Sequence, residues 1–205
     1  MPSKKTPWER ARTRLSKAVG LLLLLLAGMT ESNWEQNHDA VATFFFGLGL
    51  LLVALACSGR IWCSLYLSGR KDRMLTTEGP YSLCRNPLYF CSALGALGIG
   101  FCTETLSYPL LFAAIFALYY PGIIQREEER LLQLFGEAYA DYKRSTPRFL
   151  PSRKGLKEPP QYLVNPPLFR RHLINDTLFI FLAALLEFVE GLRHAGFAPS
   201  LLHLW

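Results

Sequence analysis

Apolar residues are gathered in long blocks along this chain of 205 residues, and polar segments separate the blocks. A helix that crosses a bilayer needs about 20 predominantly apolar residues. Four blocks approach or exceed that length, and they run from Val19 to Met29, from Ala40 to about Leu67, from Leu88 to Cys102 and from Leu106 to Ile124. The pattern therefore predicts four core transmembrane helices.

The first block is the shortest, and it follows a basic segment, as in a secretory signal peptide. Leu15 and Ala18 extend the block toward a full span, and no convincing small-x-small cleavage site lies near Ala27 to Ser32. We therefore expect a retained first span. In the second block Arg60 interrupts the apolar residues, and we expect its long side chain either to reach the membrane interface or to face a cavity.

The third block is rich in small residues, and small residues allow helices to approach closely in lipid. These are Gly95, Ala96, Gly98 and Gly100. The turn that follows, Thr103 to Ser107, is short, so the third and fourth helices should form an antiparallel pair.

Beyond the fourth block the pattern becomes amphipathic. Apolar side chains recur at spacings of three and four, which predicts a cytosolic helix that continues out of the fourth span and ends near Pro147 and Pro151. These side chains are Leu131, Leu132, Phe135, Tyr139 and Tyr142.

The last part of the chain begins with a Pro-rich stretch at residues 152–172, which we expect to be a connector. The segment from Leu173 to Leu192 is apolar but carries Asp176, Glu187 and Glu190, which are costly in lipid. It is a fifth, membrane-associated helix that either crosses the bilayer or lies in its interface.

The predicted fold class is thus an all-α, polytopic membrane helix bundle. We divide the chain into residues 1–39 (basic N-terminus, first span and acidic link), 40–151 (core) and 152–205 (connector and C-terminal helix).

The distribution of charged residues supports this arrangement and predicts its orientation in the membrane. The chain has 22 Lys and Arg against 16 Asp and Glu, a net charge of +6, which suits nucleic acid, acidic substrates or an anionic membrane face. Basic segments alternate with the apolar blocks, so we expect membrane lipids and no nucleic acid as partners. Six cations lie in residues 1–17, none in 30–39, four in 68–87, none in 103–107 and seven in 125–154. The positive-inside rule then places residues 68–87 and 125–154 together in the cytoplasm.

Cysteine usage indicates neither disulfides nor a metal site. The number of cysteines is odd and no Cys-x-x-Cys spacing occurs, so we expect reduced, free thiols. They are Cys57, Cys63, Cys84, Cys91 and Cys102.

The stretch from Thr77 to Tyr89, TEGPYSLCRNPLY, carries the densest candidate chemistry. Gly79 and Pro80 favour a turn, and Pro87 suits the first turn of the next helix, where unpaired N–H groups can meet a ligand. Arg85 and Asn86 stand at that helix entrance. An ordinary interfacial loop would also carry Tyr and Arg, so this stretch alone leaves both interpretations open.

A second group is the run Glu127, Glu128 and Glu129, just after the fourth span. On a helix these side chains point in directions about 100° apart, so at least one should face the bundle and the basic loop opposite. The run could equally form ion pairs with Arg126 and Arg130 on its own helix.

Together the two groups resemble a known family. The motifs Thr77-x-Gly79-x-Tyr81, Arg85-Asn86-Pro87-x-Tyr89 and Glu127-Glu128, followed by Phe135-Gly136, Tyr139, Tyr142, Pro147 and Leu150-Pro151, are similar to those of the integral-membrane isoprenylcysteine carboxyl methyltransferase and phospholipid methyltransferase family. The similarity covers roughly residues 40–151.

The resemblance implies binding of S-adenosylmethionine at the cytosolic face and methyl transfer to a lipid-like or hydrophobic acceptor. By analogy, cofactor-binding residues are Gly79, Tyr81, Arg85, Asn86, Pro87, Tyr89, Glu127 and Glu128, catalytic residues are Arg85, Asn86, Glu128 and Arg148, and no metal takes part.

The chain departs from the family pattern at three positions. Asn86 replaces a common His and cannot take up a proton near neutral pH. Cys91 stands where Gly is common and could narrow the approach of the cofactor. Ser145 replaces an Arg of the eukaryotic isoprenylcysteine enzymes, for which Arg148 could substitute in space.

Two other functions fit the same architecture. An NADPH-dependent reductase of the membrane sterol-reductase type has a similar C-terminal motif, and a small membrane scaffold or transporter subunit would need only an interfacial loop. The methyl acceptor, whether a prenylcysteine, a phospholipid amine or a small thiol or amine, is open, as is the oligomeric state.

Overall fold

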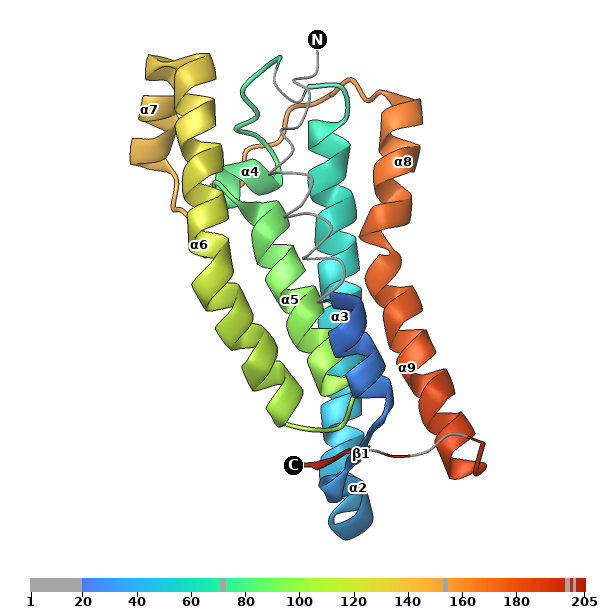
Figure 1. The fold of residues 1–205 in the computed structure, drawn as a ribbon. Coiled ribbons are helices and arrows are strands. Elements are labelled where there is room, and N and C mark those ends of the chain that lie inside the picture. The colour runs from blue at the N-terminus through green and yellow to red at the C-terminus, as the bar shows by residue number, and fades with distance from the viewer. Residues whose placement is uncertain (1–19, 71–72, 153–154, 198–199, 201) are drawn as a thin grey trace.

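The computed structural model describes residues 20–70, 73–152, 155–197, 200 and 202–205. Figure 1 shows a bundle of long helices that run side by side around α3 (Asp39–Leu67). The other long elements are α5 (Pro87–Phe101), α6 (Ser107–Phe135), α8 (Pro166–Asp176) and α9 (Leu178–His194). Residues 20–28 are helical as well.

Short elements distinguish the two ends of the bundle. One end carries α4 (Pro80–Leu83) and α7 (Glu137–Ser145), and we call it the motif end. The other end carries β1 (Thr30–Ser32), α2 (Asn33–Asn37) and β2 (Leu202–Leu204), and we call it the clasp end.

Within the described residues, three helices are long and apolar enough to cross a membrane: Asp39–Leu67, Ser107–Phe135 and Pro166–His194. α5 is shorter, because its 15 residues span only about 22 Å. Large apolar side chains point outward from these helices, including Leu118, which is 86 % exposed. An outward apolar surface of this kind suits lipid, which confirms the predicted all-α membrane bundle. The first predicted span is described only from residue 20, and its N-terminal part lies outside the described residues.

The glycines of α5 bring it close to three other helices. A Cβ on Gly98 would lie 2.9 Å from the Gly49 carbonyl oxygen of α3, and one on Gly100 would lie 2.8 Å from the Pro109 nitrogen of α6. A Cβ on Gly95 would lie 2.8 Å from the ring of Phe179 in α9. The small residues of the third span therefore let α5 approach its neighbouring helices closely, as predicted. Its short turn into α6 gives the expected antiparallel pair (Figure 1).

α6 carries the fourth predicted span and the first part of the predicted amphipathic helix without interruption, through Pro121. The helix then stops at Gly136, whose φ of 54° lies in the left-handed region, and α7 begins at the next residue. The amphipathic segment is therefore two helices, a break that the expected single helix did not include. Tyr139 and Tyr142 are buried as predicted, whereas Leu132 is 43 % exposed.

The predicted connector is too long at its C-terminal end. Residues 166–172 belong to α8, whose N-terminus is capped by the Asn165 side chain accepting a hydrogen bond from the Leu168 N–H. Pro166 occupies the first helical turn, where its missing N–H costs nothing. α8 and α9 then run along α3 as one column, long enough to cross a bilayer (Figure 1).

The Arg60 side chain does not extend to the membrane interface, which was one of its two expected positions. Its guanidinium donates to Asp176 at 3.0 Å and to the Ser92 hydroxyl at 2.5 Å, and it lies over the Phe179 ring. The Asp176 side chain is only 2 % exposed. This ion pair joins α3 to α8 and explains how an acidic residue is accommodated in the last apolar segment.

The clasp end is closed by residues from both ends of the described chain. β1 pairs in parallel with β2, with Thr30 opposite Leu202. The Trp205 carbonyl oxygen accepts hydrogen bonds from the N–H groups of Leu106 and Ser107, at 2.9 and 3.0 Å, where α6 begins. These two N–H groups lie at a helix N-terminus and have no partner within the helix.

Candidate functional site

Local backbone geometry places the motif loop (residues 77–86) against α3. Gly79 has a φ of 58°, and a Cβ there would lie 2.3 Å from the Tyr66 ring. The position therefore requires glycine both for its backbone angle and for its packing. α4 follows at once, and Pro87 then opens α5, as expected for a proline in a first turn.

Glu128 is the centre of the site. Its side chain is 6 % exposed, and its Oε1 accepts from Arg85 Nε at 3.1 Å and from Asn86 Nδ2 at 3.2 Å. Its Oε2 lies 3.4 Å from Arg148 Nε. The carboxylate thus joins the loop before α5 to the segment after α7. This confirms the expectation that one of the three glutamates faces the bundle and the basic loop opposite.

Arg85 extends these contacts into the main chain. Its Nη1 donates to the carbonyl oxygens of Lys143 and Thr146, at 2.6 and 3.0 Å. The Arg85 N–H also donates to the Pro147 carbonyl, at 2.8 Å. Because all three carbonyls lie at or after the end of α7, Arg85 holds that segment over the motif loop.

Asn86 uses its amide as a connector. Nδ2 carries two hydrogens, and it donates to Glu128 Oε1 at 3.2 Å and to the Arg148 carbonyl at 3.0 Å. A neutral imidazole has a single N–H and could satisfy only one of these acceptors. The structure therefore gives Asn86 a positioning role that His would not reproduce.

Tyr142 fixes α7 against α4. Its hydroxyl donates to the Tyr81 carbonyl at 2.6 Å, inside the protein. Burial raises the pKa of this hydroxyl, so it keeps its proton and remains a donor at physiological pH.

A cavity of about 130 Å³ lies beside this network, between the motif loop, α5 and α6. Two buried hydroxyls at its wall, Tyr81 Oη and Thr76 Oγ1, have no hydrogen-bond partner among the described residues. Burial raises the pKa of the Tyr81 hydroxyl well above its usual value, so it is neutral and able to donate. Buried polar groups are rarely left unpaired in folded proteins. Two of them at one cavity indicate a polar ligand.

Five of the predicted site residues line this cavity, and the others lie around it. Those in the wall are Tyr81, Arg85, Asn86, Tyr89 and Glu127. Glu128 lies behind the wall, with both oxygens already engaged. Pro87 starts α5 and Gly79 packs on Tyr66, so both shape the loop.

A second cavity, about 450 Å³, lies between α5 and α6 and is almost entirely apolar. Arg148 and Phe149 lie at one end, and the rest of its wall comes from membrane-depth residues such as Ala93, Leu97 and Phe116. Arg148 is therefore the residue common to this apolar cavity and the Glu128 network.

The positions that depart from the family pattern have clear surroundings. Cys91 faces α3, where a Cβ on Gly59 would lie 2.5 Å from its Sγ, so it does not narrow the cavity. All five cysteines are free and buried, as predicted. Ser145 is exposed at the end of α7, whereas Arg148 does reach Glu128.

The segment just before the motif was not among the predicted site residues. Met74, Leu75 and Thr76 form part of the cavity wall, and Thr76 supplies one of the two unpaired hydroxyls. A signal was available, since the segment directly follows the basic group at residues 70–73. No periodicity separated it from an ordinary loop.

Comparison with known proteins decides among the possible families. A family model described as phospholipid methyltransferase matches residues 38–138, which include α3, the motif loop, α5 and α6. Protein-S-isoprenylcysteine O-methyltransferase from Schizosaccharomyces pombe is 29 % identical over 155 residues, which cover 67 % of this chain and 66 % of the relative.

The chain belongs to the isoprenylcysteine carboxyl methyltransferase and phospholipid methyltransferase family.

More similar proteins carry other names. The nickel-cobalt-cadmium resistance protein NccN of Alcaligenes xylosoxydans xylosoxydans is 38 % identical over 88 % of this chain and 82 % of its own length. The cobalt-zinc-cadmium resistance protein CzcN of Cupriavidus metallidurans is 40 % identical over 86 % of this chain and 79 % of its own length. No solved structure matches the chain significantly.

Proposed function

We propose that this protein is an S-adenosylmethionine-dependent methyltransferase that acts on a lipid-like or membrane-partitioned acceptor at the cytoplasmic face. One observation carries the proposal: the buried Glu128 network lies between a small cavity with unpaired polar groups and a large apolar cavity at membrane depth. A polar cofactor and an apolar acceptor could therefore meet beside Arg148.

The residues in the small cavity fit the cofactor. Tyr81 and Thr76 offer hydroxyls, Arg85 a guanidinium, and Glu127 a carboxylate that lies 3.8 Å from Arg130. These groups complement ribose hydroxyls, a carboxylate and an ammonium. The volume of about 130 Å³ is below the roughly 300–1,000 Å³ of typical ligand sites. Binding would therefore displace the segment that contains Met74 and Thr76 outward.

S-adenosylmethionine would supply a methyl group on a sulfonium, and its transfer leaves a neutral thioether. The protein then needs mainly to align the two reactants and to exclude water. Arg85, Asn86 and Arg148 hold the wall between the cavities through Glu128, so they would set this alignment. Arg148, with a side chain 45 % exposed, is free to bind an anionic group on the acceptor as well.

The apolar cavity favours an acceptor with a hydrocarbon portion. Its wall contains aromatic and aliphatic side chains from α5 and α6, with Arg148 as its charged member. An acyl or prenyl chain would lie between the helices, and its reactive head would lie at Arg148. A soluble acceptor would leave this apolar surface unused.

Binding and transfer assays on purified protein test the proposal. Labelled S-adenosylmethionine should bind, labelled NADPH should not, and incubation with total lipid extract should label one lipid fraction. Preferential binding of NADPH would instead support a sterol-reductase type of activity. Binding of neither nucleotide would support a scaffold or transporter subunit.

The names of the two resistance-protein relatives support a proposal about physiological role. We propose that methylation by this protein increases tolerance of divalent metals such as nickel, cobalt, zinc or cadmium. A host strain lacking the gene should grow less well on these metals, and wild-type protein should restore growth. An Arg85→Ala variant that restores growth equally well would show that methyl transfer is not involved.

A further inference from the structure

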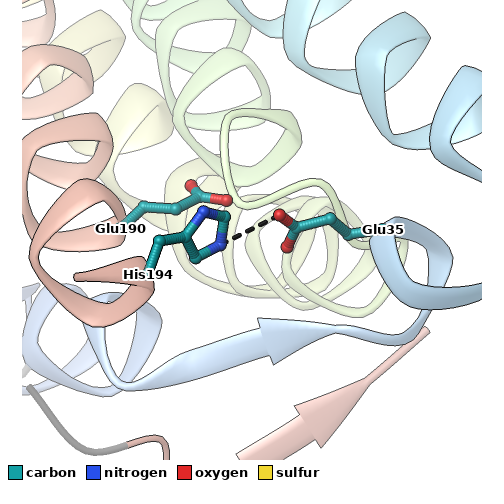
Figure 2. Close-up of side chains that lie close together, drawn as sticks. All are labelled: Glu35, Glu190 and His194. Carbon is teal, nitrogen blue, oxygen red and sulfur yellow. Dashed lines mark ion pairs between the residues drawn. The ribbon is translucent and has the colours of Figure 1, made fainter. Parts of the chain in front are cut away.

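Three metal-ligating side chains converge at the clasp end, far along the bundle from the Glu128 network. Glu190 and His194 are four residues apart in the last turns of α9, so they project from one face of that helix. Glu35 comes from α2, across the gap between the two elements. Figure 2 shows the three side chains directed toward one another.

Their geometry is close to that of a metal site. One ligand atom from each residue can be chosen so that all three lie within 4.8 Å of one another. Atoms bound at about 2.1 Å to a tetrahedral ion lie about 3.4 Å apart. Modest rotations of three side chains would therefore suffice to hold one ion.

The contacts within the group leave some of its possible metal-ligand atoms without a close partner inside the group. His194 Nε2 lies 2.9 Å from Glu35 Oε1, an ion pair that involves only two of the three residues. The Glu190 side chain is 16 % exposed, and the ion pair that the structure gives it, with Arg193, spans 4.0 Å. Arg193 is also drawn away, because it donates to the carbonyl oxygens of Gly28 and Thr30.

The surroundings are rich in negative charge. Glu104, in the turn between α5 and α6, has its pKa raised first by burial and then by the charges of Glu35, Glu187 and Asp39. Carboxylates crowded in this way repel one another, and a divalent cation would relieve that repulsion.

We propose that Glu35, Glu190 and His194 form a binding site for one borderline divalent transition-metal ion such as Zn²⁺ or Co²⁺. One imidazole and two carboxylates suit these ions, whereas Mg²⁺ and Ca²⁺ prefer oxygen ligands alone. His194 is 55 % exposed and Glu35 26 % exposed, so the ion has access from solvent, and water would complete the coordination. The bound ion would join α2 to α9, in place of the direct contact between His194 and Glu35.

The site needs no methyl transfer, and a binding assay tests it directly. The full chain is purified in detergent with an affinity tag that contains no histidine. Co²⁺ is then titrated while its visible d–d absorption is recorded, and Zn²⁺ is added in competition. We expect one Co²⁺ per chain, displaced by Zn²⁺, and at least a tenfold loss of affinity in His194→Ala and in Glu190→Gln.

A second His–Glu pair at the same end is a matched control. His203 Nδ1 lies 3.4 Å from Glu31 Oε2, between β2 and β1, and in the part of the chain that the structure describes no third ligating residue joins this pair. His203→Ala should keep the wild-type affinity for Co²⁺. Failure of the wild type to bind Co²⁺, unchanged affinity in His194→Ala, or an equal loss in His203→Ala would overturn the proposal.

A thermal measurement separates loss of the site from loss of the fold. An ion that binds only the folded state raises the melting temperature. Zn²⁺ should therefore raise the melting temperature of the wild type and of His203→Ala, and should leave that of Glu35→Gln unchanged. A Glu35→Gln variant that melts like the metal-free wild type and is still stabilised by Zn²⁺ would contradict the assignment.

Discussion

Three consecutive glutamates on α6 occupy three different environments. Glu128 is buried and binds Arg85, Asn86 and Arg148. Glu127 lines the small cavity, and Glu129 is exposed and accepts from Gln125 at 3.0 Å. The same Glu→Gln change therefore tests structural stability at Glu128, ligand binding at Glu127 and surface charge at Glu129.

We predict three outcomes for Glu→Gln variants at these positions. Glu128→Gln should abolish methyl transfer and lower stability by about 3 kcal/mol, because Arg85 loses a buried charge partner. Glu127→Gln should weaken cofactor binding and leave the melting temperature unchanged. Glu129→Gln should change neither. Cofactor titration and thermal unfolding in detergent check all three, and equal behaviour of Glu127→Gln and Glu129→Gln would exclude Glu127 from the site.

Tyr81 provides a test of the cavity itself. Tyr81→Phe keeps the ring and removes a buried hydroxyl that has no partner in the described structure. Since an unpaired buried hydroxyl costs free energy, the variant should be as stable as the wild type or more so. Its affinity for S-adenosylmethionine should fall about tenfold, as for loss of one hydrogen bond. Unchanged affinity by calorimetry would mean that the hydroxyl does not contact the cofactor.

At the scale of elements, glycine contacts set the distance between α3 and α5. A Cβ on Gly49 would lie 2.7 Å from the Cys102 backbone nitrogen, whereas one on Gly47, also in α3, would meet nothing within 4 Å. Gly49→Val should therefore prevent close packing, and Gly47→Val should be tolerated. The yield of monodisperse protein in detergent measures the difference. Equal yields would show that the two helices can separate without loss of the fold.

The ion pair between Arg60 and Asp176 links α3 to α8. Asp176→Leu leaves a buried guanidinium without its charge partner and should cost about 3–5 kcal/mol. The double variant Arg60→Met with Asp176→Leu should be more stable than either single variant, because no buried charge is left alone. Thermal unfolding of the wild type, the two single variants and the double variant gives the coupling free energy between Arg60 and Asp176. Additive effects would contradict a direct interaction.

Helix positions could be predicted from the sequence because they depend on local composition. The blocks at residues 40–67 and 88–102 correspond to α3 (Asp39–Leu67) and α5 (Pro87–Phe101) within one residue at each end. The start of α8 could also have been predicted, since Asn165 before Pro166 is a helix-capping signature. The break at Gly136 was obscured by the apolar spacing that continues on both sides of it.

Contacts between distant residues were harder to predict. The motifs predicted that Arg85, Asn86 and Glu128 lie on one face of the bundle, and in the structure hydrogen bonds join them. Arg60 with Asp176, and Glu35 with His194, gave no such signal, because nothing local in the sequence relates their positions. The strands β1 and β2, three residues each, are too short to show alternation.

At the scale of the whole molecule, the two ends of the bundle carry different chemistry. The motif end holds the Glu128 network, and the clasp end holds the Glu35, Glu190 and His194 group (Figures 1 and 2). Cations concentrate near the motif end, so the positive-inside rule predicts that this end lies in the cytoplasm. The proposed metal site would then face the opposite side of the membrane from the proposed methyltransferase site.

Single engineered cysteines test this orientation. The five native thiols are buried, so an impermeant maleimide should label them little. In intact cells, Asn37→Cys at the clasp end should react, and Ser145→Cys at the motif end should react only after the membrane is opened. Both positions are exposed. The reverse pattern would place the Glu128 network outside the cytoplasm.

The clasp between β1 and β2 has a consequence for biosynthesis. Thr30 pairs with Leu202, and Trp205 satisfies the first N–H groups of α6. Thr30 is synthesised well before Leu202, so β1 stays unpaired until the helices between these two residues have been made. A chain that stalls before residue 202 would therefore display an unpaired β1 edge to quality-control proteases.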